Sequence, residues 1–330
     1  MWSGPSAFAH GPACLGPGPG FTHRIPVGHP APVTLSPMSR PRTFVPPAGA
    51  RAYTLVTDRG EFAVVDAPVA AGVEARGVAL LLPGFTGSKE DFNRLHEALG
   101  RRGYRTVAVD GRGQFESDGP EDDESAYAQE ELARDVLAQA AAVGDGGPVH
   151  LLGHSLGGHI ARAAVLLDRS PFRSLTLMAS GPAQISPSQQ QRVKLLRDAL
   201  AVMSMAEVWE AMQALEAPEE LDALEETPED GEDLRRRWLG NKPAQLLATG
   251  RQLCAEPDRV AELAAVPLSF HVLSGARDDT WPVPLLDDMA LRLRAHRTVI
   301  EGAEHSPNTD RPAATAEALA AFWDAVADAG

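Results

Sequence analysis

The stretch Val149-His150-Leu151-Leu152-Gly153-His154-Ser155-Leu156-Gly157-Gly158 decides the fold expected for this chain. It begins as an apolar run typical of a buried strand and ends in the pattern Gly-x-Ser-x-Gly. Apolar residues then recur at helical spacing from Ala161 to Leu167. A strand, a sharp turn and a helix form the context in which such a serine is a nucleophile, and the glycines remove Cβ atoms that would collide in the turn. The pattern therefore predicts Ser155 as a nucleophile, and the alternative is a tight turn with an incidental serine.

Length and charge limit the possible classes of function. The chain has 330 residues, enough for one large α/β domain or one domain with an insertion. Its net charge of −15 argues against nucleic acid and anionic membrane surfaces as partners. No apolar run approaches the roughly 20 residues of a membrane helix, so we expect no stable membrane insertion. Cys14 and Cys254 lack a framework spacing, which favours free thiols and a cytoplasmic location. The oligomeric state cannot be inferred.

The N-terminal segment differs in composition from the rest of the chain. Residues 1–50 are rich in proline and glycine, show no hydrophobic periodicity and lack the features of a signal peptide. Such a segment cannot bury enough apolar surface to offset its ordering entropy, so we predict that it is disordered. Met38 stands close to the start of the expected domain, and we interpret it as the natural start.

Strand and helix patterns alternate through most of the remaining sequence. This alternation predicts an α/β fold with a mostly parallel central sheet flanked by helices, built from residues 51–180 and 267–330. The alternation breaks over residues 181–266, where the pattern is helical throughout. We interpret this segment as a helical cap inserted after the sixth strand, above the carboxyl ends of the strands, where open α/β sheets bind ligands.

A serine hydroxyl needs a base, and the base needs an orienting carboxylate. His305 is the leading base because it directly follows the last predicted strand. The preceding strand ends in Ser274-Gly275-Ala276-Arg277-Asp278-Asp279, which offers two carboxylates. Asp278 is the first choice and Asp279 the alternative, and one of the pair is expected to cap a turn.

Backbone N–H groups must also stabilise the oxyanion. Leu156, directly after the nucleophile, and Phe85, after the third strand, are the expected donors. Asp110 ends another strand and is interpreted as structural. No pattern indicates a metal site or a nucleotide loop, so no cofactor is expected.

The substrate pocket is less well defined by the sequence. His154 beside the nucleophile, Trp209 and Met212 in the predicted cap, and Trp281 are candidates for its lining. The alternative is that the apolar cap residues pack the cap onto itself. The acidic run 216–233 is interpreted as a solvated face or a lid segment.

Several motifs together resemble the α/β-hydrolase superfamily. The order Ser155, Asp278, His305 is that of the superfamily, and Gly275 to Pro282 is similar to its G-x-x-D-x-x-x-P signature. Pro83-Gly84-Phe85 resembles its His-Gly-x oxyanion loop, with proline in place of histidine. The segment 110–118 resembles its D-x-x-G-x-G-x-S loop, but Phe115-Glu116 replaces the second glycine region. The insertion is similar to the cap of the esterase, monoacylglycerol lipase and lysophospholipase-like branch.

The resemblance implies a serine hydrolase that cleaves an acyl bond in a small molecule. A serine nucleophile argues against the dehalogenases and epoxide hydrolases of the superfamily, which use aspartate. A small or medium carboxylic ester is the expected substrate. The alternatives are a thioesterase, a lactonase, a C–C hydrolase, or a cofactor-free perhydrolase or lyase. A non-catalytic ligand-binding module is the more remote possibility.

Overall fold

The computed structural model describes residues 39–215 and 228–328, together with Met1. The strands are β1 (Arg51–Thr57), β2 (Gly60–Ala67), β3 (Gly77–Leu82), β4 (Tyr104–Val109), β5 (Val149–His154), β6 (Phe172–Met178), β7 (Ser269–Gly275) and β8 (His296–Ile300). The α-helices are α1 (Asn93–Arg101), α2 (Gln129–Val143), α3 (Leu156–Leu167), α4 (Pro187–Leu200), α5 (Met205–Leu215), α7 (Pro228–Gly240), α8 (Pro243–Ala255), α9 (Val260–Ala264), α10 (Val283–Leu293), α11 (Pro307–Asp310) and α12 (Pro312–Asp328). Short 3₁₀ helices cover Lys89–Phe92 and Glu124–Tyr127.

The strands form one mostly parallel sheet, as predicted. Within the described residues it has eight strands in the order β1-β2-β4-β3-β5-β6-β7-β8. β1 and β2 are antiparallel to their neighbours, and every pairing from β4 to β8 is parallel. β5 lies centrally, with Leu81 of β3 opposite Leu152 and Thr176 of β6 on its other side. The carboxyl ends of these parallel strands therefore meet at one edge of the sheet, where β5 delivers Ser155.

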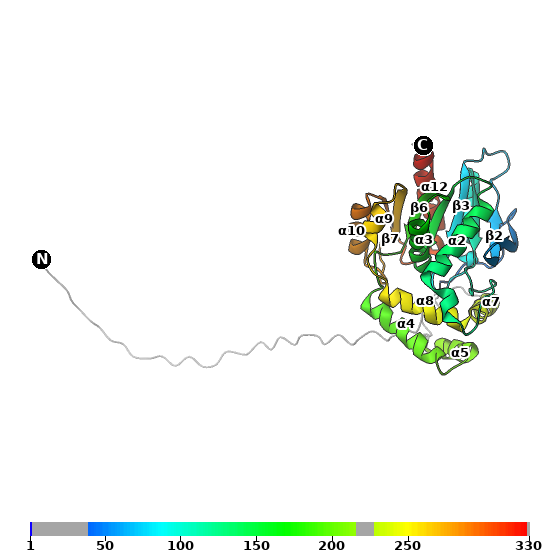
Figure 1. Ribbon diagram of the computed structural model, residues 1–330, viewed down its shortest axis with the longest axis vertical. Helices are drawn as coiled ribbons and strands as arrows, with labels where there is room; N and C mark the ends of the chain where they lie inside the picture. Colours follow the sequence, from blue (N-terminus) through cyan, green and yellow to red (C-terminus); the bar gives the residue numbers. More distant parts are fainter. Residues whose placement is uncertain (2–38, 216–227, 329–330) are drawn as a thin grey trace, which may run out of the picture. The chain divides into compact units, whose positions relative to one another are not determined.

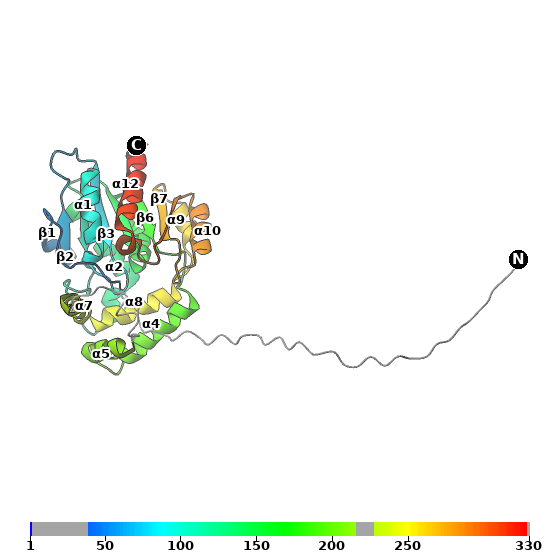
Figure 2. The same cartoon turned by 180° about the vertical axis from the view of Figure 1, so that it is seen from behind.

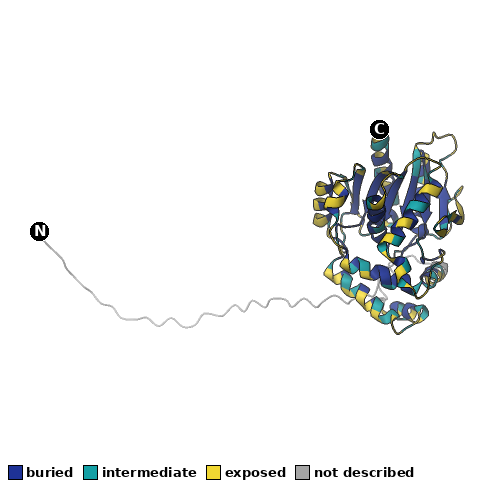
Figure 3. Ribbon diagram, in the orientation of Figure 1, coloured by how far each residue is buried: buried dark blue, intermediate teal, exposed yellow. Residues whose placement is uncertain are grey.

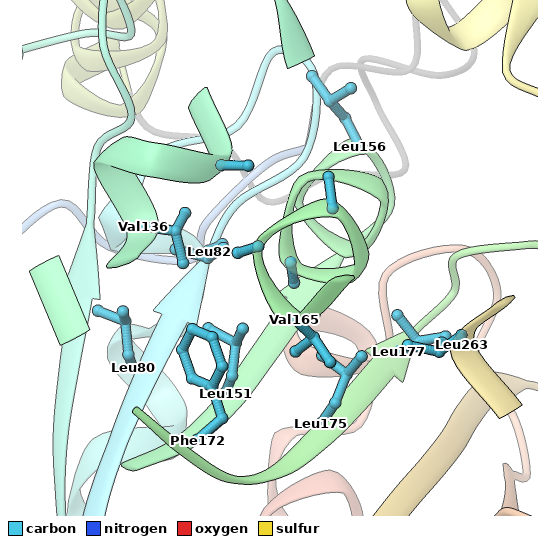
Figure 4. Close-up of a cluster of buried hydrophobic side chains, with 14 of the residues drawn as sticks. Leu80, Leu82, Val136, Leu151, Leu156, Val165, Phe172, Leu175, Leu177 and Leu263 are labelled. Atoms are coloured by element: carbon cyan, nitrogen blue, oxygen red, sulfur yellow. The ribbon is translucent and has the colours of Figure 1, made fainter. Parts of the chain in front are cut away.

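Helices cover both faces of the sheet, because its central strands are apolar on both sides. α1 and α12 lie on one face, and α2, α3 and α10 lie on the other (Figures 1 and 2). Neighbouring residues of one strand serve different layers: Leu80 packs beneath α2 and α3, whereas Leu81 packs beneath α1 and α12. Buried residues accordingly run through the sheet and the inner sides of the helices (Figure 3), and Figure 4 shows Leu151 and Leu175 within the larger cluster.

The insertion between β6 and β7 covers the strand ends, with α4, α5, α7 and α8 at one end of the sheet (Figure 1). It has an apolar cluster of its own, formed by Leu196, Val208, Trp209, Met212, Leu234, Trp238 and Leu246. α9 differs, because Val260 and Leu263 belong to the core cluster and the helix packs against α10 and α3. The predicted cap of residues 181–266 therefore extends too far, and the chain has returned to the core by residue 260. Of the acidic run, residues 216–227 lie outside the described residues.

A single arginine holds both ends of the insertion. Arg162 of α3 is buried, and its Nη1 donates to the carbonyl oxygen of Pro182 at 2.7 Å, where the insertion begins. Its Nη2 donates to Oε1 of buried Glu256 at 2.6 Å, where α8 has just ended. A buried charge needs such a partner to offset its desolvation. The two linkers are thus fixed to the helix that follows Ser155.

The prediction that the disordered segment extends to residue 50 is wrong, because residues 39–50 are ordered in the structure. Pro41 is buried, Phe44 packs against the cap cluster, and the side-chain amide of Asn93 donates to carbonyl groups of this segment. The part of the chain that packs on the domain therefore begins before residue 50. The predictions for residues 2–38, including Met38 as the start, lie outside the described residues.

The central strand gives a direct test of this packing. We expect Leu151→Ala to lower the free energy of unfolding by about 2–5 kcal/mol, because it leaves a cavity at a side chain that is fully buried. The matched control Leu291→Ala changes a leucine that is 79% exposed and should stay within about 0.5 kcal/mol of wild type. Urea unfolding followed by circular dichroism measures both, and equal midpoints for the two variants would contradict the assigned core.

Candidate active site

Ser155 stands in a strained turn between β5 and α3. Its backbone has φ 54° and ψ −119°, a conformation that is unfavourable for a residue with a Cβ. The flanking glycines make the turn possible. A Cβ on Gly153 would collide with the carbonyl of Gly157, and one on Gly157 would lie 2.5 Å from the carbonyl oxygen of Pro83. The expected strand–turn–helix arrangement is present, and it lifts the serine hydroxyl out of the sheet.

The structure brings together the three side chains selected from the sequence. Nε2 of His305 lies 3.1 Å from Oγ of Ser155. Nδ1 of the same ring lies 3.0 Å from Oδ2 and 3.1 Å from Oδ1 of Asp278. Both ring nitrogens of His305 are therefore engaged, one by the candidate nucleophile and the other by a carboxylate.

The choice between the two neighbouring aspartates has a geometric answer. The Asp278 carboxylate is fully buried and accepts hydrogen bonds from the backbone N–H of Thr280 (2.8 Å) and Trp281 (3.1 Å). These bonds fix its orientation toward His305. The Asp279 side chain is 62% exposed and instead accepts from the Gln189 amide at 2.7 Å. The contact with His305 thus belongs to Asp278.

The two expected oxyanion donors lie at the same sheet edge as Ser155. Leu156 is the first residue of α3, and Phe85 follows β3 in a loop that lines the cavity. Gln114, which the sequence analysis missed, fixes this loop because its Nε2 donates to the carbonyl oxygen of Gly84 at 2.9 Å. The only sequence signal for Gln114 is its place in the glycine-rich loop after β4.

A cavity of about 140 Å³ opens beside Ser155. Its lining combines core loops with cap side chains: Ser39, Gly84, Phe85, Thr86, Gly87, His154, Ser155, Ile185, Gln189, Arg192, Val193, Leu196, Leu253, Thr280, His305 and Ser306. The apolar part comes mainly from α4 and α8, whose amphipathic pattern was visible in the sequence. Nothing in that pattern indicated which helix face would meet the nucleophile.

Three of the four residues predicted to line the pocket are placed elsewhere. Trp209 and Met212 are buried in the cap cluster, because their helix packs the cap onto itself. Trp281 stands behind His305, with ring centroids 6.1 Å apart, and its indole N–H donates to the carbonyl of Ala183 at 2.9 Å. His154 does line the cavity.

His154 is a second histidine in contact with the candidate base. Its Nε2 lies 2.9 Å from the carbonyl oxygen of His305, so this nitrogen carries the hydrogen. The two rings are tilted, with centroids 5.3 Å apart. Burial, and to a smaller extent the neighbouring His305, lower the pKa of His154 to about 4. A neutral His154 therefore supports the loop of His305 without adding charge to the site.

Buried charges brace the loop below the cavity. Asp110, interpreted from the sequence as structural, accepts from the backbone N–H of Lys89 at 2.7 Å and from its Nζ at 2.8 Å. Burial raises the pKa of the Asp110 carboxyl more than the Lys89 ammonium lowers it, so that the pKa lies at about 7. Lys89 also contacts Glu90 and Glu116. These contacts fix the turn that follows the oxyanion loop.

The model of the alpha/beta hydrolase family matches residues 79–318. The chain belongs to the alpha/beta hydrolase family. It is therefore a hydrolase with the superfamily fold that its motifs resemble, and the family model spans both the core and the cap.

Two curated relatives indicate how widely the chemistry of this family ranges. A 2-hydroxy-6-oxononadienedioate/2-hydroxy-6-oxononatrienedioate hydrolase of Cupriavidus pinatubonensis is 33% identical over 218 residues, covering 64% of this chain and 72% of that protein. A pimeloyl-[acyl-carrier protein] methyl ester esterase of Aeromonas hydrophila is 30% identical over 171 residues, covering 49% and 65%.

Solved structures share the fold at low sequence identity. A thermophilic esterase from Thermogutta terrifontis matches with a TM-score of 0.66 and 22% identity, over 84% of this chain and 99% of that one. The enol-lactonase from Burkholderia xenovorans LB400 matches with a TM-score of 0.66 and 17% identity, over 82% and 100%. These likenesses concern the fold alone.

The described residues contain no group of three or more histidine, cysteine, aspartate or glutamate side chains placed to hold a metal ion. No helix among them is long and apolar enough to cross a bilayer.

The buried environment of His154 predicts a low pKa that can be measured. We expect His154 to remain neutral, with hydrogen on Nε2, until the pH falls to about 4, whereas a histidine in the unfolded chain protonates near pH 6.5. Because the unfolded chain binds the proton first, His154 contributes stability that is full above pH 6.5 and is lost as the pH falls toward 4. Long-range ¹H–¹⁵N NMR measures the midpoint, and a value near 6.5 in the folded protein would contradict this environment.

Proposed function

We propose that this hydrolase cleaves small or medium carboxylic esters through an acyl-enzyme on Ser155. The observation that carries the proposal is the continuous contact from Ser155 Oγ to His305 Nε2 and from His305 Nδ1 to Asp278. A hydroxyl, a base within hydrogen-bond reach and a buried carboxylate that orients the base are the parts that acyl transfer requires.

The proposed reaction has two halves. His305 accepts the Ser155 proton as Oγ attacks the ester carbonyl, and Asp278 stabilises the resulting imidazolium. The backbone N–H groups of Phe85 and Leu156 hold the oxyanion. His305 then protonates the leaving alcohol and the acyl-enzyme forms. In the second half, His305 deprotonates the water that attacks the acyl carbonyl. His305 then returns this proton to Oγ of Ser155 as the acid is released.

The cavity favours an apolar substrate chain. Ile185, Val193, Leu196 and Leu253 supply an aliphatic surface next to Phe85. Burial of a methylene group against such a surface contributes roughly 0.8 kcal/mol to binding. An aliphatic acyl ester of modest length matches this lining. The proposal therefore places the enzyme in the capped esterase branch of the superfamily.

Hydrolysis of a C–C bond is the second candidate. One observation favours it: a relative that is 33% identical to this chain is a hydrolase of 2-hydroxy-6-oxononadienedioate. The cavity also contains Arg192 and Gln189, polar groups that could bind a substrate carboxylate. Against it, Nη1 of Arg192 lies 3.7 Å from Asp279, which already supplies a negative charge.

The nucleophile is tested by substitution. We expect Ser155→Ala to lower kcat on p-nitrophenyl butyrate by about 10⁴-fold or more, because members of such a constellation act as a unit. The variant should also lose labelling by a fluorophosphonate. Ser170→Ala, an exposed serine outside the cavity, is the matched control and should retain both properties. Near wild-type turnover by Ser155→Ala would rule out the acyl-enzyme.

A substrate panel separates the two candidate reactions. We expect kcat/KM for a C4–C6 aliphatic ester to exceed that for 2-hydroxy-6-oxononadienedioate by about tenfold or more, equivalent to roughly 1.4 kcal/mol of transition-state binding. Thioesters and lactones of equal acyl length complete the panel. A preference of that size for the dienedioate would replace the ester proposal with C–C hydrolysis while leaving Ser155 in place.

A further inference from the structure

Residues 39–45, which we call the N-terminal strap, are fastened to the core. The side-chain Nδ2 of Asn93, at the start of α1, donates to the carbonyl oxygens of Thr43 at 3.0 Å and Val45 at 3.2 Å. Asn93 is buried, so losing these partners would leave its amide group unpaired away from water. The two bonds therefore hold one end of the strap at a defined place.

The end of the strap that Asn93 holds also packs against the cap. Phe44 contacts the apolar cluster of the cap helices. Its ring lies edge-on to Phe115, with centroids 6.3 Å apart, and the Arg237 guanidinium lies 5.7 Å from its centroid. Phe44 thus contacts groups from the cap and from the loop after β4.

Arg237 of α7 fastens the other end of the strap. Its Nη2 donates to the carbonyl oxygen of Ser39, and its Nη1 lies 3.0 Å from Oδ1 of Asp91. The Arg237 and Asp91 side chains are both 0% exposed. Asp91 Oδ2 in turn accepts from the backbone N–H of Ser88, in the loop that carries Phe85. One buried guanidinium therefore joins the strap, the cap and the oxyanion loop.

This fastening places Ser39 on the wall of the cavity, together with Val193 and Leu196 of α4. We infer that the strap determines specificity, because Ser39 limits the length of the substrate chain that the cavity accepts. The inference rests on the proposed ester hydrolysis. In it, the strap forms a third part of the cavity wall, beside the parts formed by the core and the cap. The side chain of Ser39 is small, and its enlargement should shorten the accepted chain.

The test compares long and short esters in the full-length protein. We expect Ser39→Phe to lower the ratio of kcat/KM for p-nitrophenyl decanoate to that for p-nitrophenyl acetate by about tenfold or more, because a few lost methylene contacts have effects of that size. Asn93→Ala removes both strap bonds and should change the same ratio in the opposite direction, by about threefold. Fluorophosphonate titration counts the intact sites in each preparation.

Arg42→Phe is the matched control, since Arg42 is an exposed strap residue that does not line the cavity. It should leave the length ratio unchanged. A ratio for Ser39→Phe equal to that of wild type, with decyl acetate hydrolysed equally well by both, would overturn the role of the strap. Failure of the wild-type protein to hydrolyse any ester would instead contradict the proposed function, so the two failures are distinguishable.

Discussion

The left-handed backbone at Ser155 is the constraint on which the site depends. A non-glycine residue in such a conformation costs about 1–3 kcal/mol and persists only where its surroundings fix it. Here the Ser155 N–H donates to the carbonyl of Met178 on β6, and the Ser155 carbonyl accepts from Gly158 in α3, each at 2.9 Å. Gly157 meanwhile packs on the carbonyl groups that end β3. Two strands of the sheet and the helix α3 thus determine where the hydroxyl stands, and Nε2 of His305 lies within hydrogen-bond distance of it.

Buried ion pairs connect the loops that surround this turn. Lys89 with Asp110 braces the oxyanion loop, Arg162 with Glu256 joins the ends of the cap, and Arg237 with Asp91 links the cap to the core. Pairs of this kind contribute little net stability compared with apolar replacements. Their partners are nevertheless specific, because a buried charge without its partner is strongly unfavourable. We interpret the pairs of Arg162 with Glu256 and of Arg237 with Asp91 as the contacts that set the registry between the cap and the core.

The fold and the contacts of Ser155 could be predicted because their signals are local. The apolar runs of β3 and β5 and the glycines around Ser155 specify strand and turn directly, and the end of a strand locates Asp278 and His305. The wall of the cavity could not be predicted in the same way. Trp209 and Val193 both lie on amphipathic cap helices, and only the packing of one helix on another decides that Trp209 faces the cap interior and Val193 the cavity. The strap was missed because its order comes from Asn93 and Arg237, which are 48–198 residues away in sequence.

The two-point attachment at Arg162 has a consequence for how such an enzyme can change. The carbonyl of Pro182 and the carboxylate of Glu256 are held by the same side chain, so the chain leaves and re-enters the core at one place. The polypeptide between these points can be lengthened, shortened or exchanged for another helical unit without altering the path of α3 or the position of Ser155. The core then acts as a constant reaction centre to which different recognition modules are joined. Substrate range can diverge by insertion and replacement while the geometry that carries out the chemistry is inherited unchanged.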